Sequence, residues 1–214
     1  RNSEGNIIEG AVSEGKETIT NAEYAHAEGL RTVATGMYSH AEGDNTTALN
    51  NSSHAEGNNT KANGDCSHAE GYRSVATGNY SHAEGCDTQA ISYGSHAEGY
   101  QTQASSSYSH SEGYQTKALG FCSHAEGYDT TTDGDCSHAE GEGTSASFGS
   151  QHVQGKYNIE DIESKYAHIV GNGNSDRERS NAHTIDWGGN AWYAGDVTNG
   201  NGVSLDGLNT NMSD

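Results

Sequence analysis

Histidine and glutamate are the residues of this sequence best suited to chemistry, and they recur together. A Ser-His-Ala-Glu-Gly motif, with occasional substitutions, returns every 14 residues. Its histidines are His26, His40, His54, His68, His82, His96, His110, His124, His138 and His152. Imidazole and carboxylate groups can bind transition metals, exchange protons near neutral pH or bond to each other. Which of these they do depends on where the repeat places them.

A metal ladder is one hypothesis, because three chains around a threefold axis would bring three imidazoles to each level. Its candidate ligands are His40, His54, His68, His82, His96, His110, His124 and His138. We favour a ladder of His–Glu hydrogen bonds between chains, because nine of the histidines are followed two residues later by Glu, which a metal ladder would not require. We therefore expect no cofactor. Either ladder should respond to pH, with a sign set by the balance of Glu pairing and His–His repulsion.

The motif does not support catalysis. Ser and His are adjacent in it, and neighbours on a strand point to opposite faces. The carboxylates form columns, and no pair stands out as glycoside hydrolysis would require. We predict that the chain is not an enzyme.

A fixed 14-residue period predicts a solenoid, in which equivalent residues of successive coils stack in columns. The coil from Ser39 to Ser52 divides into two five-residue strands and two two-residue turns. Two strands per coil give a flattened all-β roll of two parallel, in-register sheets, with coils about 4.8 Å apart. Ten coils would form a rod of roughly 45–50 Å.

Composition narrows the class of protein further. Only 30% of residues are hydrophobic and 29 are Gly, which leans toward disorder, but a disordered chain has no reason to keep a strict period. There is no Pro to interrupt a strand ladder. The formal net charge of −20 argues against nucleic acid or an anionic membrane as partner. No 18-residue apolar run or signal peptide is present, and the chain reads as part of something longer.

The two faces of each predicted strand differ. Ser39, Ala41 and Gly43 of one strand should meet Thr46 and Ala48 of the other inside the roll. A Thr column runs beside them, which we interpret as an internal hydroxyl ladder: Thr32, Thr46, Thr60, Thr88, Thr102, Thr116, Thr130 and Thr144. The outer face of the second strand varies freely, as a solvent face would.

The outer face of the first strand instead repeats His and Glu. Stacked carboxylates would repel one another, and the thin interior buries little apolar area, so we expect this face to pack against copies of the chain. The predicted trimer interface contains His40, Glu42, His54, Glu56, His68, Glu70, His82, Glu84, His96, Glu98, His110, Glu112, His124, Glu126, His138 and Glu140, with Trp187 and Trp192.

Two resemblances make this interpretation more specific. The half-coils Ser74-Val75-Ala76-Thr77-Gly78 and Ser81-His82-Ala83-Glu84-Gly85 resemble the head repeats of YadA-type trimeric adhesins, over residues 22–155. That family implies a left-handed parallel β-roll and a homotrimer, although His and Glu here replace its usual apolar pair and imply a polar interface. The motif, with the segments 165–173 and 179–197, also resembles tail-fibre proteins of phages and prophages of Gram-positive bacteria.

The ends of the chain depart from the repeat. Residues 1–21 read as an N-terminal cap or linker, 22–155 as the array, 156–197 as a C-terminal cap and 198–214 as a polar linker. Ala167-His168-Ile169-Val170-Gly171 is a last echo of the motif, 16 residues after His152. Gly188-Gly189-Asn190 lies between two apolar stretches and predicts a β-hairpin in a trimeric base.

Two further columns lie at turns. Tyr72, Tyr100, Tyr114 and Tyr128 could contact sugars of a cell-wall polymer, but we favour simple stacking along the edge of the roll. Cys66, Cys122 and Cys136 share one repeat position; with Cys86 they form no CxxC pair, so we favour free thiols over a zinc site.

These expectations combine into one functional hypothesis. The chain should be a stiff, trimeric segment of a phage or prophage tail fibre or related adhesin, made in the bacterial cytoplasm and working in the virion or an extracellular particle. Its partners should be its own copies, other tail proteins and a bacterial surface glycan or other host receptor. The enzyme alternative is a tailspike-like cell-wall or polysaccharide hydrolase appendage. An ice-binding solenoid is less favoured, since the Thr column reads as internal.

Overall fold

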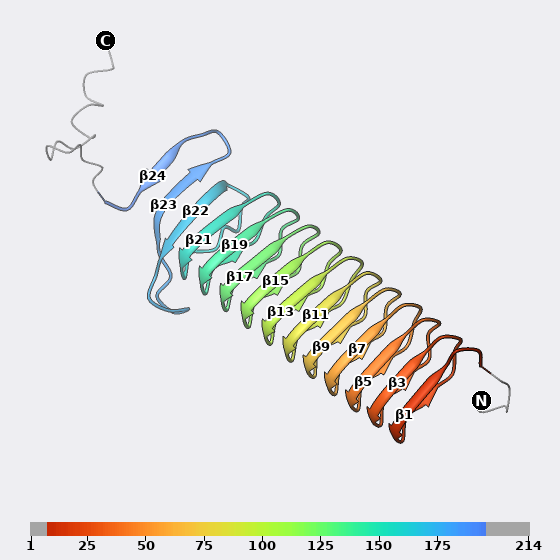
Figure 1. Cartoon of the computed structure of the whole chain (residues 1–214). Coiled ribbons are helices and arrows are strands. Elements are labelled where there is room, and N and C mark those ends of the chain that lie inside the picture. Colours follow the sequence, from red (N-terminus) through yellow and green to blue (C-terminus); the bar gives the residue numbers. More distant parts are fainter. Residues whose placement is uncertain (1–7, 196–214) are drawn as a thin grey trace, which may run out of the picture.

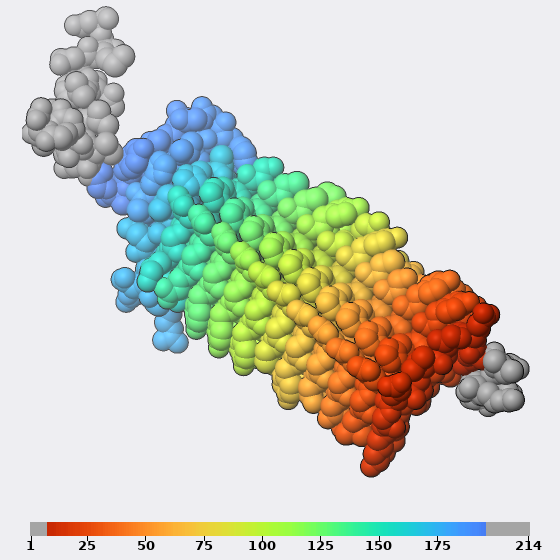
Figure 2. Space-filling view, in the orientation of Figure 1, coloured from red at the N-terminus to blue at the C-terminus, as the bar shows by residue number. Residues whose placement is uncertain are grey.

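The chain folds into a straight rod of stacked coils with its described ends at opposite ends of the rod (Figure 1). The structure is a computed structural model, and it describes residues 8–195. The predicted linker 198–214 lies outside the described residues, as do the first seven residues of the predicted N-terminal cap. The side chains repeat from coil to coil along the surface of the rod (Figure 2).

Two sheets run along the rod. The larger sheet has 14 strands, and eleven of them, each five residues long, come one from each coil. These are β1 (Val12–Lys16), β3 (His26–Leu30), β5 (His40–Asp44), β7 (His54–Asn58), β9 (His68–Tyr72), β11 (His82–Cys86), β13 (His96–Tyr100), β15 (His110–Tyr114), β17 (His124–Tyr128), β19 (His138–Glu142) and β21 (His152–Lys156). The remaining three are β22 (Tyr166–Asn172), β23 (Asn181–Asp186) and β24 (Ala191–Tyr193).

The smaller sheet has ten strands of two residues each. They are β2 (Ile19–Thr20), β4 (Val33–Ala34), β6 (Thr47–Ala48), β8 (Lys61–Ala62), β10 (Val75–Ala76), β12 (Gln89–Ala90), β14 (Gln103–Ala104), β16 (Lys117–Ala118), β18 (Thr131–Thr132) and β20 (Ser145–Ala146). The predicted five-residue second strand is therefore too long. The chain already turns after Ala48, where the Ser53 amide donates to the Asn50 carbonyl and Ser52 takes a φ of 54°.

The register confirms the predicted parallel solenoid with 14-residue coils. His40 pairs with His54, and Ala41 with Ala55, and the same shift holds in both sheets. The register extends beyond the first motif, because β1 pairs with β3 in parallel and Gly15 lies opposite Gly29. With β22, which pairs in parallel with β21, the solenoid has about 12 turns.

The interior is as narrow as the sequence predicts. Ala41, Ala48 and Thr46 are fully buried, and so are their equivalents in the coils from β3 to β20, whereas Ser13 of β1 and Thr20 of β2 are not. Gly43 is different, because it is exposed and takes a φ of 109°, so the strand leaves regular alternation there. The motif Ser closes a turn, since the Ser39 hydroxyl donates to the Gly36 carbonyl at 2.6 Å.

The predicted hydroxyl ladder is wrong. Six of the eight hydroxyls in the Thr column have no hydrogen-bond partner, namely those of Thr32, Thr46, Thr60, Thr88, Thr102 and Thr130. Stacked coils lie about 4.8 Å apart, which is beyond hydrogen-bond length, so equivalent hydroxyls cannot reach each other. The exceptions bond within their own coil: Thr116 and Thr144 each donate to the carbonyl four residues earlier at 3.1 Å.

The C-terminal end confirms that residues 167–171 form a last coil-like strand and that a β-hairpin follows. His168 pairs with His152, and Ile169 with Val153, so β22 stacks on the last regular coil. Strands β23 and β24 then run antiparallel, joined through Gly188 and Gly189. Within residues 8–195, no helix is long and apolar enough to cross a membrane.

Candidate functional site

The histidines form a continuous stack on the outer face of the large sheet. From His26 to His152, successive ring centroids are 4.6 to 4.9 Å apart and the rings are within 7° of parallel. The spacing is that of the coils themselves, because parallel in-register strands place identical residues directly over one another. The predicted His/Glu face is therefore one surface of a single chain.

Each imidazole from His26 to His152 lies within 4.0 Å of at least one carboxylate, and His68 lies close to carboxylates of two coils. The Nε2 atom of His68 is 3.8 Å from Glu70 in its own coil and 3.9 Å from Glu56 in the preceding coil. These distances are too long for hydrogen bonds. His138 comes nearer, with its Nε2 at 3.3 Å from Glu126.

Although side chains such as His40 and His82 are about one third exposed, most Nε2 atoms of the histidines are buried. Those of His26, His40, His54, His68, His82, His96, His110, His124, His152 and His183 are buried and have no hydrogen-bond partner. The pKa values of His40, His82 and His110 are lowered, first by burial and then by the neighbouring imidazoles, and the nearby Glu residues only partly offset this. The neutral form is therefore favoured at these three positions of the stack.

The geometry limits how the face could hold a metal ion. Ligand atoms of His82, Glu84 and His96 lie within 4.8 Å of one another, and other coils repeat this arrangement. Two bonds of about 2.0–2.1 Å from imidazole to zinc span at most ~4.2 Å. In their parallel stacked orientation, with ring centroids 4.8 Å apart, the lone pairs of His82 and His96 do not converge on one ion. The metal ladder considered as the less favoured hypothesis would therefore need imidazoles from other chains.

Shallow grooves run beside the histidine stack. One has a volume of about 540 Å³ and another about 490 Å³. Both are lined by Glu side chains along one edge and by Gly backbone, the first by Glu42, Glu56, Gly57, Glu70, Gly71 and Gly85. The face therefore has a ridge of histidines with an acidic groove alongside.

The predicted Tyr column stacks on itself. Tyr114 lies between Tyr100 and Tyr128, with ring centroids 5.0 Å away on each side. Both faces of its ring are covered, so a sugar could reach only the ring edge. Simple stacking is thus confirmed for these three, whereas Tyr72 stands apart because Cys86 occupies its position in the next coil.

A second aromatic edge was not predicted. Tyr80, Tyr93, Tyr108 and Phe121 make edge-to-face contacts at 5.2 to 5.8 Å, and Tyr24 stacks on Tyr38. Tyr80, Tyr93, Tyr108 and Phe121 alternate between two adjacent positions of the repeat, so a search for one conserved column position does not find them.

The four cysteines are free, and Cys66, Cys122 and Cys136 are exposed at a turn, as expected.

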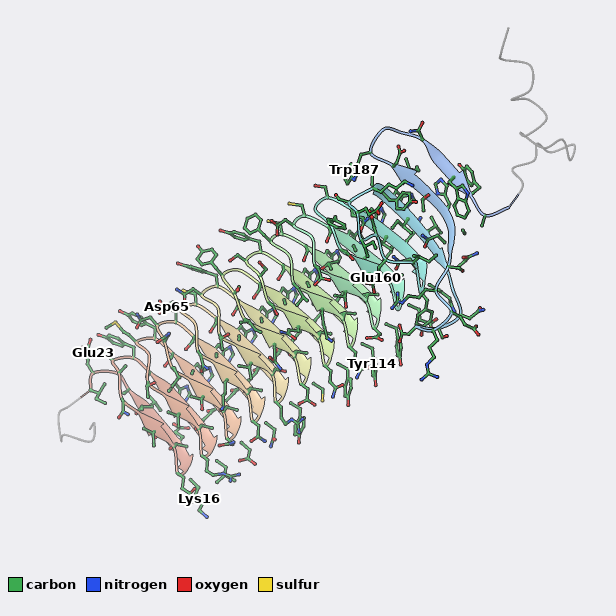
Figure 3. The ribbon with its side chains drawn as sticks, turned by 180° about the vertical axis from the view of Figure 1, so that it is seen from behind. Lys16, Glu23, Asp65, Tyr114, Glu160 and Trp187 are labelled. Atoms are coloured by element: carbon green, nitrogen blue, oxygen red, sulfur yellow. The ribbon has the colours of Figure 1, made fainter. Side chains whose placement is uncertain are left out.

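The two tryptophans lie at the C-terminal end, where Figure 3 labels Trp187. Trp187 is in the hairpin turn, and Trp192 is in β24. Trp192 pairs with Thr184, which pairs with the buried Ile169, so Trp192 lies on the interior face of the sheet. Its neighbour Tyr193 stacks on His183 at 4.4 Å and continues the outer face. Trp192 and the predicted His/Glu interface therefore lie on opposite faces of the large sheet.

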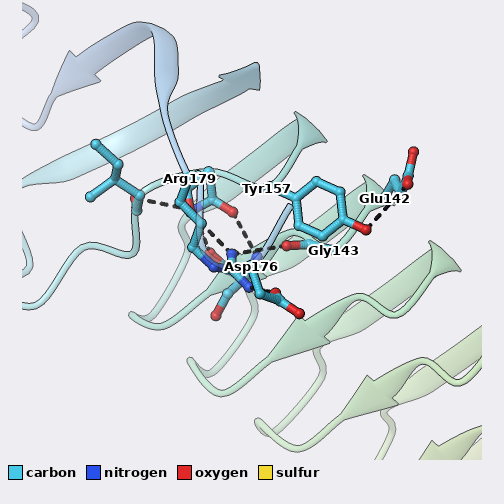
Figure 4. Close-up of polar contacts among 8 residues, drawn as sticks. Glu142, Gly143, Tyr157, Asp176 and Arg179 are labelled. Atoms are coloured by element: carbon cyan, nitrogen blue, oxygen red, sulfur yellow. Dashed lines mark hydrogen bonds and ion pairs between the residues drawn. The ribbon is translucent and has the colours of Figure 1, made fainter. Parts of the chain in front are cut away.

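Sequence reasoning also missed the polar contacts that close the end of the rod. Arg179 donates to the carbonyls of Gly143 at 2.9 Å and Asn158 at 3.1 Å, and to Asp176 at 2.7 Å (Figure 4). Its guanidinium lies 5.9 Å from the centroid of the Tyr157 ring. This side chain ties the segment after β22 to the last regular coils.

No protein-family model and no curated protein sequence matches this chain. The fold and the arrangement of the His/Glu face must therefore carry the functional argument.

Proposed function

We propose that the chain is a stiff segment of a homotrimeric fibre, of the kind found in phage or prophage tails and related adhesins. In this proposal three left-handed rolls pack through their His/Glu faces around a common axis. The rod spaces or presents a surface that contacts a bacterial host, through a surface glycan or another receptor, and joins other tail proteins in the particle.

The observation that carries the proposal is the contrast between the two outer faces. The face of the large sheet repeats His and Glu in nine coils, whereas the outward positions of the small sheet hold Val33, Thr47, Lys61, Gln89 and other unlike residues. A surface in contact with water tolerates such variation, and a surface packed against equivalent chains does not. The outer face of the large sheet is therefore the natural interface.

The energetics of one roll support the same conclusion. Its core consists mainly of Ala, Ser and Thr, which bury little apolar area per coil. The lowered pKa values of His40 and His82 also favour neutral rings at these positions, and neutral rings can enter an interface at smaller desolvation cost than charged ones. An association of several chains would bury a further face and strengthen an otherwise thin solenoid.

Solution mass by light scattering tests the proposal. We expect three times 22.5 kDa at pH 8 and a change in mass or stability at pH 5. Replacing His82 and His96 together by Ala should weaken assembly. The control replaces Gln89 and Gln103 by Ala, since these residues lie in β12 and β14 of the small sheet and should leave the mass unchanged. A well-folded monomer at pH 8 would refute the trimer.

The enzyme alternative is a cell-wall or polysaccharide hydrolase appendage. The Glu residues of the coils repeat in columns, and no pair among them stands apart as an acid and nucleophile would, which favours the non-enzymatic proposal. Glu160 and Asp186 at the C-terminal end lie outside these columns, but Asp186 accepts hydrogen bonds from Asn190 that lower its pKa, which does not suit a general acid. Release of reducing ends from purified bacterial wall by this chain would favour the hydrolase instead.

A further inference from the structure

The core of the roll opens at its C-terminal end. One interior column runs through Ala139, Val153, Ile169, Thr184 and Trp192, each paired with the next across adjacent strands. The first three are fully buried and Thr184 is 3% exposed, whereas Trp192 is 55% exposed. The column thus ends on a large aromatic side chain that the rest of the described chain only half covers.

The opening exists because the two sheets have different lengths. The small sheet ends at β20, while the large sheet continues through β22, β23 and β24. The segment 157–165 contains no strand, and it approaches β23, where the Ile159 amide donates to the Asn181 side chain at 2.9 Å. Between them is a cavity of about 680 Å³, lined on its apolar side by Ile159, Trp192 and Ala194. This volume is typical of small-molecule sites.

Polar groups line the rest of this cavity. Asp186 accepts hydrogen bonds from the backbone amide and the side chain of Asn190, at 2.8 and 2.9 Å, which fixes the hairpin turn. The Lys165 ammonium is 5.0 Å from the centroid of the Tyr166 ring, which holds it at the rim. Glu160 completes the set, and Figure 3 shows it at the same end of the rod as Trp187.

We infer that this cavity, the Trp192 pocket, binds a neutral saccharide. A half-exposed indole offers a flat apolar surface to the C–H face of a sugar ring, and the surrounding ammonium, carboxylate and amide groups can bond to its hydroxyls. A pocket meant for an apolar protein segment would not need so many polar groups in its wall. The inference rests on the proposed function, because it gives the host-contacting fibre a specific receptor site.

Charge selects the class of sugar. Glu160 and Asp186 outweigh Lys165 at the pocket, and the whole chain carries a formal charge of −20. Sugars bearing phosphate or carboxylate groups would be repelled. Hexoses, deoxyhexoses and N-acetylhexosamines would not.

The position of the pocket leaves it accessible in the proposed fibre. Trp192 lies on the interior face of the large sheet, whereas the proposed interface is the outer face of that sheet. A trimer built on the His/Glu faces would therefore leave the pocket open in each chain. Three pockets on one particle would raise the avidity of weak single sites for a repetitive glycan.

The chain holds only two tryptophans, which allows a direct test. In the Trp187→Phe variant the fluorescence reports Trp192 alone, and in Trp192→Phe it reports Trp187, which is similarly exposed but does not line the pocket. The probes are the methyl glycosides of glucose, galactose, rhamnose, N-acetylglucosamine and N-acetylgalactosamine. We expect a saturable change with at least one probe in Trp187→Phe, at a dissociation constant on the order of 1 mM, and none in Trp192→Phe.

A second variant guards against loss of folding. Ala194→Leu adds bulk at an exposed residue lining the pocket and should abolish the change in the Trp187→Phe background, with the far-ultraviolet circular dichroism intact. The inference fails if no probe alters Trp192 fluorescence, or if both tryptophans respond alike. A lower solution mass for Trp192→Ala would show that the pocket is instead a contact between copies. A trimer of unchanged mass without sugar binding would refute the pocket and leave the proposed function standing.

Discussion

The glycine after each Glu of the motif is a position where a larger residue would not fit, and Gly85 illustrates why. It takes a φ of 111° in β11, a region that side chains of other residues rarely adopt. A methyl group added there would overlap the carbonyl oxygen of Gly99 in the next coil and lie 3.0 Å from its amide nitrogen and carbonyl carbon. All three atoms are backbone, so no side chain can rotate away.

Gly189 provides a matched control. Its φ is 85°, but an added methyl group would meet nothing within 4 Å, because the residue lies in the hairpin turn. Gly→Ala at either position costs about 1–3 kcal/mol for the backbone conformation. At Gly85 the coils of β11 and β13 must also separate, and losing two ladder hydrogen bonds with buried groups left unpaired adds about 2–6 kcal/mol.

We therefore expect Gly85→Ala to lose at least ~2 kcal/mol of unfolding free energy beyond Gly189→Ala. For a chain of this size that difference lowers the melting temperature by about 4–8 °C. Circular dichroism on heating measures it, and hydrogen exchange should show the lost protection in β11 and β13, since coils of a solenoid interact mainly with their neighbours. Equal melting temperatures for the two variants would refute the steric reasoning.

Two further predictions concern the histidines and Arg179. Burial and neighbouring imidazoles lower the pKa values of His40, His82 and His110 below 6.5 in the folded chain. As the pH falls, the unfolded chain therefore binds protons before the folded chain does. The free energy of unfolding should then decrease as the pH drops from 6.5 through the lowered pKa values. A melting temperature that is flat or rising from pH 8 to pH 5 would contradict this sign. Arg179→Ala should cost about 1.5–3 kcal/mol through its lost charged hydrogen bonds, seen as faster hydrogen exchange in residues 172–195, whereas the exposed Arg177→Ala should have little effect.

The periodic part of the fold could be predicted because it depends on stacking of identical residues. A strict 14-residue period fixes which residues pair, and the small size of Ala41 and Ala48 identifies the interior. The stacked imidazoles follow from the same register. A chain with varied coils would not have revealed its columns so directly.

Local geometry within a coil was harder to predict. Alternation along a strand placed Gly43 inside, but its positive φ turns the backbone at that point. The Thr hydroxyls were expected to bond along their column, yet the spacing between coils is fixed by backbone pairing at about 4.8 Å and side chains cannot shorten it. The first error came from treating five residues as one regular strand, and the second from overlooking the fixed spacing between coils.

Two substitutions near the C-terminal end explain why the regular coils stop there. Gln151 stands where other coils have Ser, and Asn158 where they have Thr. Both are fully buried or nearly so. The Gln151 amide donates to Asp161 and to the Tyr166 carbonyl, and the Asn158 side chain bonds the Ser145 amide and carbonyl at 2.8 and 3.0 Å.

These longer side chains replace hydrogen bonds that a further short strand would have made. The Asn158 amide occupies the pairing groups of Ser145 in β20, so the small sheet has no eleventh strand, while the large sheet goes on to β22 and the hairpin. A buried amide is stable there only because its donors and acceptors are satisfied. The small sheet ends where side chains replace its backbone pairing. Trp192 of the large sheet therefore has no strand facing it, and this gap forms the pocket at the end of the core.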